Sequence, residues 1–314
     1  MNPPVRVGVI GVGYLGRFHA EKYAALSEVE LVGVADVQPE RGQSLAQTLN
    51  TRSFVDYRQL LPLVDAISVA VPTTEHFPVV RDSLNQGCHV LVEKPLAADV
   101  AEAQQLVRLG RERGRYLMVG HLERFNAGME EMRRRVTQPG FIESHRLAFY
   151  KERGIDVDVV LDLMIHDLDH VLSLVNSPVQ EIRAAGVSVL TDKIDLANAR
   201  LEFQNGCIAN LTASRMSLKS MRRFRLFQPD TYLAVDFEAQ ELTVAARQEG
   251  ALGPIPGVAL DIQRFPKEDV LLKEITAFVN AIKNGEEPPV NGEAGLAALE
   301  LAMNINAAMK TAQG

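Results

Sequence analysis

Residues 5–16 read VRVGVIGVGYLG, and this stretch decides the fold of the first part of the chain. The continuous apolar run at residues 5–10 predicts a buried strand, which leads directly into a G-x-G-x-x-G pattern. Helical periodicity begins at Tyr14. A strand, a tight glycine turn and a helix in this order form the setting in which the pattern binds the pyrophosphate of a dinucleotide, at the positive end of the helix.

Each residue of the glycine pattern has an expected part in this binding. Gly11 forms the turn, Gly13 lets the backbone approach the pyrophosphate, and Gly16 allows the helix to pack closely against the strand. Tyr14 and Leu15 begin the helix, where unpaired N–H groups face the anion. A glycine turn that binds no ligand is the alternative interpretation.

The same alternation of apolar runs and helical patterns continues through the first 120 residues. Continuous apolar strands, each followed by a helix, predict an α/β domain with a Rossmann-type doubly wound parallel sheet. Strands are expected at residues 5–10, 31–35, 53–55, 66–71, 89–92 and 116–119, and helices at 14–26, 39–49, 57–61, 75–85 and 99–113.

The pattern changes after a helix expected at residues 126–136. Short turns then separate successive strands, which predicts an α+β domain with a large, mainly antiparallel open sheet. These strands are expected at residues 142–150, 182–190, 197–203, 207–214, 223–228, 232–236 and 241–245, with helices at 159–175, 269–283 and 295–311 and a loop at 250–257. We therefore expect a dinucleotide-binding domain at residues 1–122 and a second domain at residues 123–314.

The composition excludes several classes of protein. The 314 residues are 46% hydrophobic and 23% charged, as in a globular protein with a sizeable core. The net charge of −7 has the wrong sign for nucleic-acid binding. No apolar run reaches the roughly 20 residues of a membrane span, and two cysteines, Cys88 and Cys207, are too few for a disulfide framework. We expect a cytoplasmic protein without nucleic-acid or membrane partners.

Asp36 ends the second expected strand, 20 residues after Gly16. A carboxylate at this position accepts hydrogen bonds from both ribose hydroxyls of adenosine and repels a 2′-phosphate. The next two residues are not basic, although Arg41 lies on the following helix. The sequence therefore favours NAD over NADP. Helix capping before Pro39 is the alternative role of Asp36, and it is compatible with ribose binding.

Two further strands end in polar residues at the same edge of the sheet. Thr73 and His76 follow the fourth strand and are candidate cofactor contacts, although His76 is equally well placed as an ordinary helix residue. The fifth strand ends in Glu93-Lys94-Pro95, where Glu93 and Lys94 also approach the cofactor. The Lys94 ammonium can stabilise the alkoxide that develops as hydride leaves an alcohol. The alternative is a surface lysine paired with Glu93.

The helix expected at residues 159–175 carries a second polar cluster. Asp162 and His166 are four residues apart, and Asp169 is seven from Asp162, so a regular helix places the three on one face. A neutral imidazole there can accept the hydroxyl proton while the carboxylate orients the substrate. A buried Asp–His pair without chemistry is one alternative. A metal site of Asp162, His166 and His170 is another, but no fourth ligand is apparent, and we predict no metal.

Basic residues elsewhere are expected on solvated helix faces and strand edges. Arg124, Lys151 and Arg153 are the candidates for contacts to a phosphorylated substrate.

These motifs together resemble the glucose–fructose oxidoreductase / inositol dehydrogenase / MocA (Gfo/Idh/MocA) family. The resemblance covers essentially the whole chain and rests on residues 11–16, 93–95, 120–126, 162–167, 264–269 and 288–290. It implies a nicotinamide-dependent dehydrogenase that acts on a secondary alcohol of a sugar or polyol. It also implies a catalytic lysine at Lys94, an acid/base histidine at His166 and a substrate-orienting carboxylate at Asp162.

The resemblance implies further properties of the second domain. It would bind the substrate and join subunits through the open face of its sheet, in a homodimer or homotetramer. Many members carry glycines before and within the Asp-x-x-x-His helix, and residues 154–166 of this chain depart from that pattern. This version is similar to the branch that oxidises C3 of nucleotide-activated amino sugars, such as UDP-N-acetylglucosamine. A free-sugar or polyol dehydrogenase and a non-catalytic dinucleotide-binding regulator are the alternatives.

Overall fold

The computed structural model describes residues 3–150, 157–251 and 254–313. The chain divides into two units, each with its own contacts. Unit 1 comprises Met1–Leu122 and Asp269–Leu299, and unit 2 comprises Glu123–Glu268 and Glu300–Gly314. No helix in the described part of the chain is long and apolar enough to cross a membrane.

The sheet of unit 1 has the strand order β3-β2-β1-β4-β5-β6, and all its neighbouring strands are parallel. The predicted doubly wound sheet is therefore confirmed. The order reverses between β1 and β4, which is the position where such sheets bind ligands. The strands are β1 (Val5–Ile10), β2 (Val29–Ala35), β3 (Arg52–Phe54), β4 (Ala66–Val69), β5 (His89–Glu93) and β6 (Leu117–Gly120).

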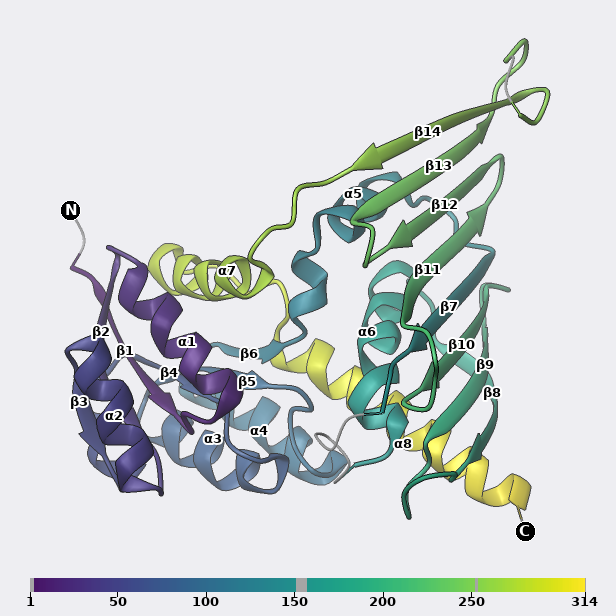
Figure 1. The fold of residues 1–314 in the computed structure, drawn as a ribbon. Helices are drawn as coiled ribbons and strands as arrows, with labels where there is room; N and C mark the ends of the chain where they lie inside the picture. Colours follow the sequence, from purple (N-terminus) through teal and green to yellow (C-terminus); the bar gives the residue numbers. More distant parts are fainter. Residues whose placement is uncertain (1–2, 151–156, 252–253, 314) are drawn as a thin grey trace. The chain divides into compact units, whose positions relative to one another are not determined.

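Helices cover both faces of this sheet, with α1 and α7 packed together on one face and α3 and α4 on the other (Figure 1). The side chain of Asp99 caps α4 by accepting from the Glu102 N–H, and Gly114 ends the helix in the left-handed conformation. The helices of this unit are α1 (Tyr14–Ala25), α2 (Pro39–Leu49), α3 (His76–Asn85), α4 (Val100–Arg113), α7 (Val270–Asn284) and the beginning of α8 (Gly292–Gln313).

One segment of unit 1 that was predicted to be a helix is not an α-helix in the structure. The helix predicted at residues 57–61 is replaced by two 3-10 turns, Tyr57–Gln59 and Leu61–Leu63. Pro62 has no N–H group with which to continue a helix from Tyr57, and Asp56 caps the first short turn through the Arg58 N–H.

The segment Asp269–Leu299 differs from the expected domain division, which placed it in the second domain. Helix α7 packs against α1 and buries Ile275 and Phe278. Val119 of β6 donates its N–H to the carbonyl oxygen of Val290 at 2.9 Å. The apolar face of α7 thus completes the core of unit 1, and only the last part of α8 belongs to unit 2.

The sheet of unit 2 has the strand order β14-β13-β12-β11-β7-β10-β9-β8. Its pairings are antiparallel except that between β7 and β10, so the predicted mainly antiparallel sheet is confirmed. The strands are β7 (Phe141–Leu147), β8 (Val179–Val187), β9 (Leu196–Phe203), β10 (Ile208–Ser214), β11 (Met221–Gln228), β12 (Thr231–Asp236), β13 (Glu241–Arg247) and β14 (Val258–Arg264).

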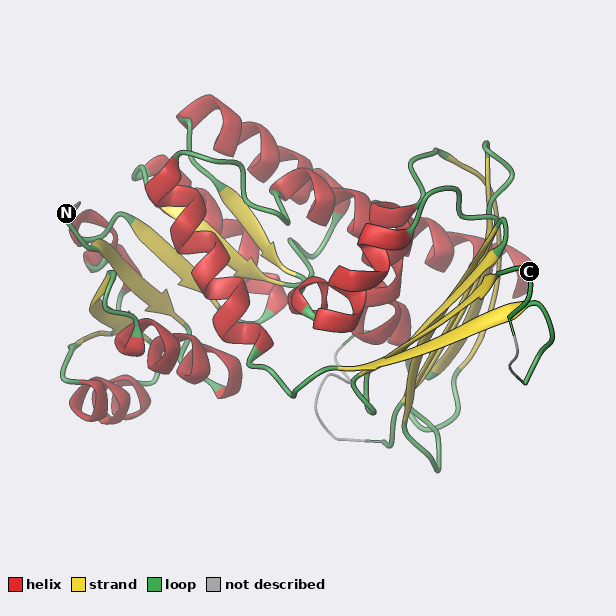
Figure 2. Cartoon of the chain, turned by 90° about the horizontal axis from the view of Figure 1, so that it is seen from above, coloured by secondary structure: helices red, strands yellow, loops and turns green. Residues whose placement is uncertain are grey.

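Helices of unit 2 cover one face of its sheet (Figure 2). They are α5 (Ala127–Arg135), α6 (Ile165–Leu174) and the end of α8, and their apolar residues form one core with the inward side chains of the strands. The other face of the sheet carries polar and partly exposed side chains, because residues alternate between the two faces.

Strand β14 has no counterpart among the predicted strands. It pairs only with β13 at the edge of the sheet, and none of its residues is buried. An edge strand with two exposed faces lacks the apolar run or clean alternation by which strands are recognised in sequence.

Candidate active site

The predicted residues of unit 1 follow the carboxyl ends of four parallel strands. Gly11 follows β1, Asp36 follows β2, Thr73 follows β4 closely, and Lys94 follows β5. Because parallel strands all end at one edge, these residues belong to the same edge of the sheet. This is the edge at which doubly wound sheets bind their ligands.

Two glycines of the loop are required by the chain itself. Gly11 has φ +80°, and a Cβ atom there would lie 2.8 Å from the carbonyl oxygen of Ala70. A Cβ atom on Gly16 would lie 1.8 Å from the carbonyl oxygen of Gly11. Gly16 is thus the contact that lets the first turn of α1 approach the end of β1.

Gly13 is different, because no atom in the described part of the chain would crowd a Cβ there. Its φ is −66°, and the nearest atom to an added Cβ is Arg41 Nη1 at 3.9 Å. The open space lies at the N-terminus of α1, where unpaired N–H groups attract an anion. This cradle fits the pyrophosphate of a dinucleotide, and an added methyl group would occupy part of it.

Asp36 connects the glycine loop to the start of α2. Its Oδ2 atom accepts from the Val12 N–H at 2.9 Å, and its Oδ1 atom accepts from the Gln38 N–H at 2.8 Å. The nearly buried carboxylate also has Arg41 Nη1 at 3.5 Å from Oδ2. The carboxylate thus binds the N–H of Gln38, the N-cap residue of α2, but the helix has no side-chain cap, so the capping alternative is not confirmed. Ribose binding stays a prediction.

His76 is buried at the start of α3. Its Nδ1 atom lies 2.8 Å from the carbonyl oxygen of Pro95, and its Nε2 atom lies 3.0 Å from that of Val71. Burial lowers the pKa of His76 despite these hydrogen bonds. The ring thus joins the end of β4 to the Glu93-Lys94-Pro95 segment, whose Lys94–Pro95 peptide bond is cis. Thr73 lies partly buried in a 3-10 turn, Thr73–Glu75.

A buried hydrogen-bonded chain that the sequence did not reveal supports Glu93, the residue before Lys94. His19 Nε2 donates to Glu93 Oε1 at 2.9 Å, and His19 Nδ1 lies 3.1 Å from Ser68 Oγ. The Ser68 and Tyr23 hydroxyls are 2.8 Å apart. Burial by itself raises the pKa of Glu93, but the His19 hydrogen bond, with the charges of His19 and Lys94, holds it below its ordinary value.

In unit 2, Asp162 and His166 lie on either side of a change in helix type. Residues Val160–Met164 form a π-helical turn, in which the Ile165 N–H donates to the Val160 carbonyl oxygen, and α6 follows. Single π turns are frequent at functional sites. Asp162 and His166 are both half-buried.

The expectation that Asp169 shares their face assumed a regular α-helix. In the structure Asp169 is buried and accepts from Arg124 Nε and Nη2, each at 2.6 Å. This pairing also commits Arg124, a predicted substrate contact, to a partner within the protein. Its side chain is only 15% exposed. Lys151 and Arg153 lie outside the described residues.

Arg146 of β7 forms the principal ionic cluster of unit 2. Its Nε and Nη2 atoms donate to Asp167 at 2.8 and 2.9 Å, and its Nη1 and Nη2 atoms donate to Glu123 at 2.7 and 2.5 Å. Since Asp167 follows His166 directly, this double bidentate contact fixes the start of α6 on the sheet. One signal in the sequence could have revealed this cluster. Residues of β7 alternate between the two faces of the sheet, and Arg146, two residues after Ser144, falls on the buried face, where a charged side chain needs a partner.

The same cluster keeps Glu123 ionised. Burial acts to raise the pKa of Glu123, but Arg146, with His170 and His166, holds it well below its ordinary value. His170 is buried with its ring stacked on Phe237, and its Nε2 atom lies 3.8 Å from Glu123 Oε2. Within the ranges that the structure describes, no group of three or more His, Cys, Asp or Glu residues is arranged to hold a metal ion.

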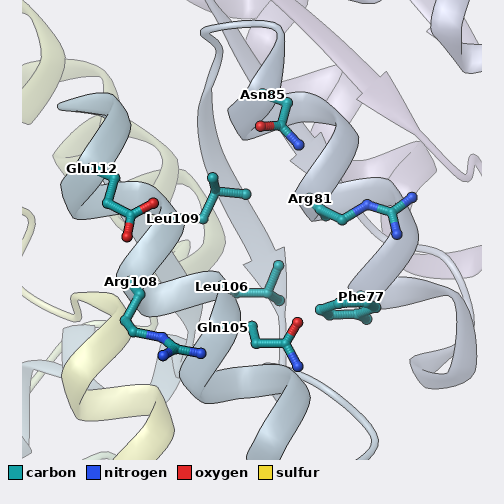
Figure 3. A pocket seen from close by; sticks show the side chains of 8 residues that line it. All are labelled: Phe77, Arg81, Asn85, Gln105, Leu106, Arg108, Leu109 and Glu112. Atoms are coloured by element: carbon teal, nitrogen blue, oxygen red, sulfur yellow. The ribbon is translucent and has the colours of Figure 1, made fainter.

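A separate pocket of about 270 Å³ opens between α3 and α4 (Figure 3). It is lined by Phe77, Arg81, Asn85, Gln105, Leu106, Arg108, Leu109 and Glu112. None of the predicted site residues contributes to this lining. It therefore belongs to the helical face of unit 1 and not to the carboxyl edge.

The sheet order, the glycine cradle and the polar strand ends together define a dinucleotide-binding protein of the Rossmann class. Residues 5–121 match a family model described as "Oxidoreductase family, NAD-binding Rossmann fold", and residues 128–228 match the "GFO/IDH/MocA C-terminal domain". The chain belongs to the GFO/IDH/MocA family of oxidoreductases.

Several relatives match the chain along nearly its whole length. The UDP-N-acetylglucosamine 3-dehydrogenase of Acidithiobacillus ferrooxidans is 41% identical over 98% of this chain and 97% of its own. A solved structure of that enzyme superposes with a TM-score of 0.94, covering 99% of both chains at 40% identity. The myo-inositol 2-dehydrogenase of Thermotoga maritima is 26% identical over 95% of this chain and 94% of its own.

Alanine substitutions at Gly13 and Gly16 distinguish a glycine needed for dinucleotide binding from one needed for folding. Gly13→Ala should change the free energy of unfolding by no more than about 0.5 kcal/mol, because the added methyl group meets only open space. It should weaken dinucleotide binding about tenfold or more, equivalent to about 1.4 kcal/mol. Urea unfolding and calorimetric titration with NAD measure the two effects.

Gly16→Ala is the matched comparison, since its methyl group would overlap the Gly11 carbonyl oxygen. It should cost about 1–3 kcal/mol of stability or more. Unchanged NAD affinity in a folded Gly13→Ala protein would contradict a phosphate cradle at this loop.

Arg146→Met should destabilise the protein by about 3–5 kcal/mol, because it removes the ionic contacts of the buried Asp167 and of the partly buried Glu123. Arg183→Met is the control, since Arg183 forms an exposed pair with Glu181 and should cost about 0–1 kcal/mol. Because the folded-state pKa of Glu123 is depressed, its stabilisation is present above the ordinary Glu pKa and lost as pH falls towards the folded value. The difference between wild type and Arg146→Met, measured by urea unfolding, should therefore shrink in acid. Equal losses for the two variants would refute the ionic anchor.

Proposed function

We propose that this chain oxidises a sugar secondary alcohol, C3 of a nucleotide-activated amino sugar such as UDP-N-acetylglucosamine, with NAD as the hydride acceptor. The observation that carries the proposal is the 41% identity, over nearly the full length of both chains, to a UDP-N-acetylglucosamine 3-dehydrogenase. The fold agreement with a solved structure of that enzyme supports it.

Three side chains carry the proposed chemistry. The Lys94 ammonium donates a hydrogen bond to the reacting hydroxyl and stabilises the negative charge that develops on its oxygen. The neutral imidazole of His166 accepts the hydroxyl proton, and the Asp162 carboxylate orients the substrate by accepting a hydrogen bond from a neighbouring hydroxyl. The bound nicotinamide supplies the acceptor carbon for the hydride.

Neighbouring residues hold two of these groups. The ionised Glu93, fixed by His19, gives the Lys94 ammonium a negative neighbour on its own strand end. Asp167, fixed by Arg146, anchors the turn that carries His166. Preorganised groups of this kind reduce the rearrangement that the reaction requires.

We propose NAD over NADP on the position of Asp36. Its carboxylate is held beside the glycine loop by the Val12 N–H, where a negative charge disfavours the 2′-phosphate of NADP. Arg41 Nη1 lies 3.5 Å from the Asp36 carboxylate. Its positive charge offsets the negative charge of Asp36, so it reduces the preference for NAD over NADP but does not create a preference for NADP. We also propose a cytoplasmic location, in keeping with two free, buried cysteines.

We further propose that unit 2 pairs with a second copy of this chain through the uncovered face of its sheet. A row of directly paired apolar residues crosses six strands on that face: Leu260, Ala245, Tyr232, Phe227, Phe141 and Ile208. Leu260 is 50% exposed and Ile262, two residues along β14, is 49% exposed. An exposed row of apolar residues of this kind is characteristic of subunit contacts.

The decisive experiment is NADH formation from NAD with UDP-N-acetylglucosamine, glucose or myo-inositol, in the presence of a carbonyl trap. We expect signal with the nucleotide sugar and less with NADP in place of NAD. Lys94→Met should lower turnover by about 10² or more while NAD binding persists, and Lys193→Met, at an exposed position, should leave it unchanged.

Each contrary result has a defined meaning. Turnover of myo-inositol alone would replace the nucleotide sugar by a polyol. Full activity of Lys94→Met would remove the lysine from the reaction. NAD binding without turnover of any alcohol would favour a regulator that binds the dinucleotide.

Leu260→Asp tests the proposed pairing. A charge buried in an apolar contact is costly, so the variant should shift the protein towards monomer in sedimentation experiments. Glu249→Asp, a conservative change at an exposed position, is the control. A wild-type monomer at micromolar concentration would refute the pairing.

A further inference from the structure

Glu274 of α7 is a buried carboxyl group to which the proposed reaction assigns no part. Its side chain is fully buried among the residues of unit 1. Within the described part of the chain, neither of its two oxygen atoms has a hydrogen-bond partner. A glutamate in this position is unusual, because glutamates are almost never fully buried without a partner.

The surroundings of Glu274 contain another acid. Glu93, at the end of β5, and Tyr23, on α1, are both near enough to Glu274 to interact with it electrostatically. Helix α1 packs against α7. His19, also on α1, donates to Glu93 and not to Glu274. Lys94 acts on Glu93 from the next position in the chain. The favourable partners in this region are thus directed to Glu93.

The two carboxyl groups therefore differ in charge. A fully buried carboxylate that accepts no hydrogen bond from the protein costs far more when ionised than when neutral, so Glu274 retains its proton. Glu93 has the His19 donor and remains ionised. Two neighbouring acids that share one negative charge are the ordinary outcome when like charges are buried near each other.

We infer that Glu274 is a buried carboxylic acid that keeps its proton and is therefore neutral. Of the two acids, Glu93 then carries the negative charge, and it lies next to Lys94 in the chain. Glu274 is a positioning residue, since it acts on the reacting groups through Glu93. Its relevance to catalysis rests on the proposed role of Lys94, but its protonation does not.

Ionisation of Glu274 would have a definite effect on stability. Burial first, and the charge of Glu93 second, raise the pKa of Glu274 well above its ordinary value. A group whose pKa is raised in the folded state binds a proton more tightly there than in the unfolded chain. The stability of the protein therefore falls as pH rises from the ordinary Glu pKa towards the folded value.

Glu274→Gln keeps the shape and neutrality of the acid but cannot ionise. We expect its stability relative to wild type to increase from about pH 5 to about pH 8. Glu287→Gln, an exposed glutamate in the same unit, should show no such increase. Glu274→Leu, which is neutral and apolar, provides a second variant should the amide fold poorly, and should show the same trend.

Infrared spectroscopy gives a direct readout. Wild type near pH 7 should show the carbonyl stretch of a protonated carboxylic acid, and Glu274→Gln should lack it. With substrate, the alkaline part of the pH profile of kcat/KM should differ between wild type and Glu274→Gln. Glu287→Gln should retain the wild-type profile.

Absence of the protonated band in wild type, or equal pH dependence of stability in Glu274→Gln and Glu287→Gln, would overturn the inference. Neither measurement requires a substrate, so failure of the sugar assay leaves this test intact. Conversely, absence of the band from wild type, together with normal sugar oxidation, would reject the neutral acid and keep the proposed function.

Discussion

The close approach of α1 to the end of β1 is the constraint on which unit 1 depends. It exists because Gly16 has no side chain where the Gly11 carbonyl oxygen passes. The same helix carries His19 and Tyr23, one and two turns further on, to Ser68 and Glu93. One packing contact thus fixes both the anion-binding end of the helix and the charged support behind Lys94.

The elements predicted correctly were those whose apolar pattern reflects burial. β1 and α2 have their expected bounds, because continuous apolar runs and regular helical spacing record which faces meet the core. β14 was missed because an exposed edge strand leaves no such record. The π turn at Val160–Met164 was missed because it changes the hydrogen-bond spacing without changing the residue pattern.

Part of the candidate site could be predicted from the sequence, because all parallel strands of a sheet end at the same edge. Asp36 and Lys94 could be placed at the carboxyl edge of the sheet from the alternation of strands and helices alone. Their partners could not, because a contact such as Arg146 with Glu123 and Asp167 joins three elements distant in sequence. For His76, both assignments fitted the sequence, and the sequence could not show that its ring lies between the carbonyl oxygens of Pro95 and Val71.

The open space at Gly13 has a consequence for how such sequences change over time. Gly11 and Gly16 are required by the packing of the chain, whereas an added methyl group at Gly13 would meet only open space at the end of the helix. In a descendant that had given up its dinucleotide, selection for a stable fold would preserve the first and third glycines and release the middle one. The first and third glycines would therefore record the requirements of folding, and the middle one the use of a ligand. The sequence of such a descendant would show which requirement had been lost.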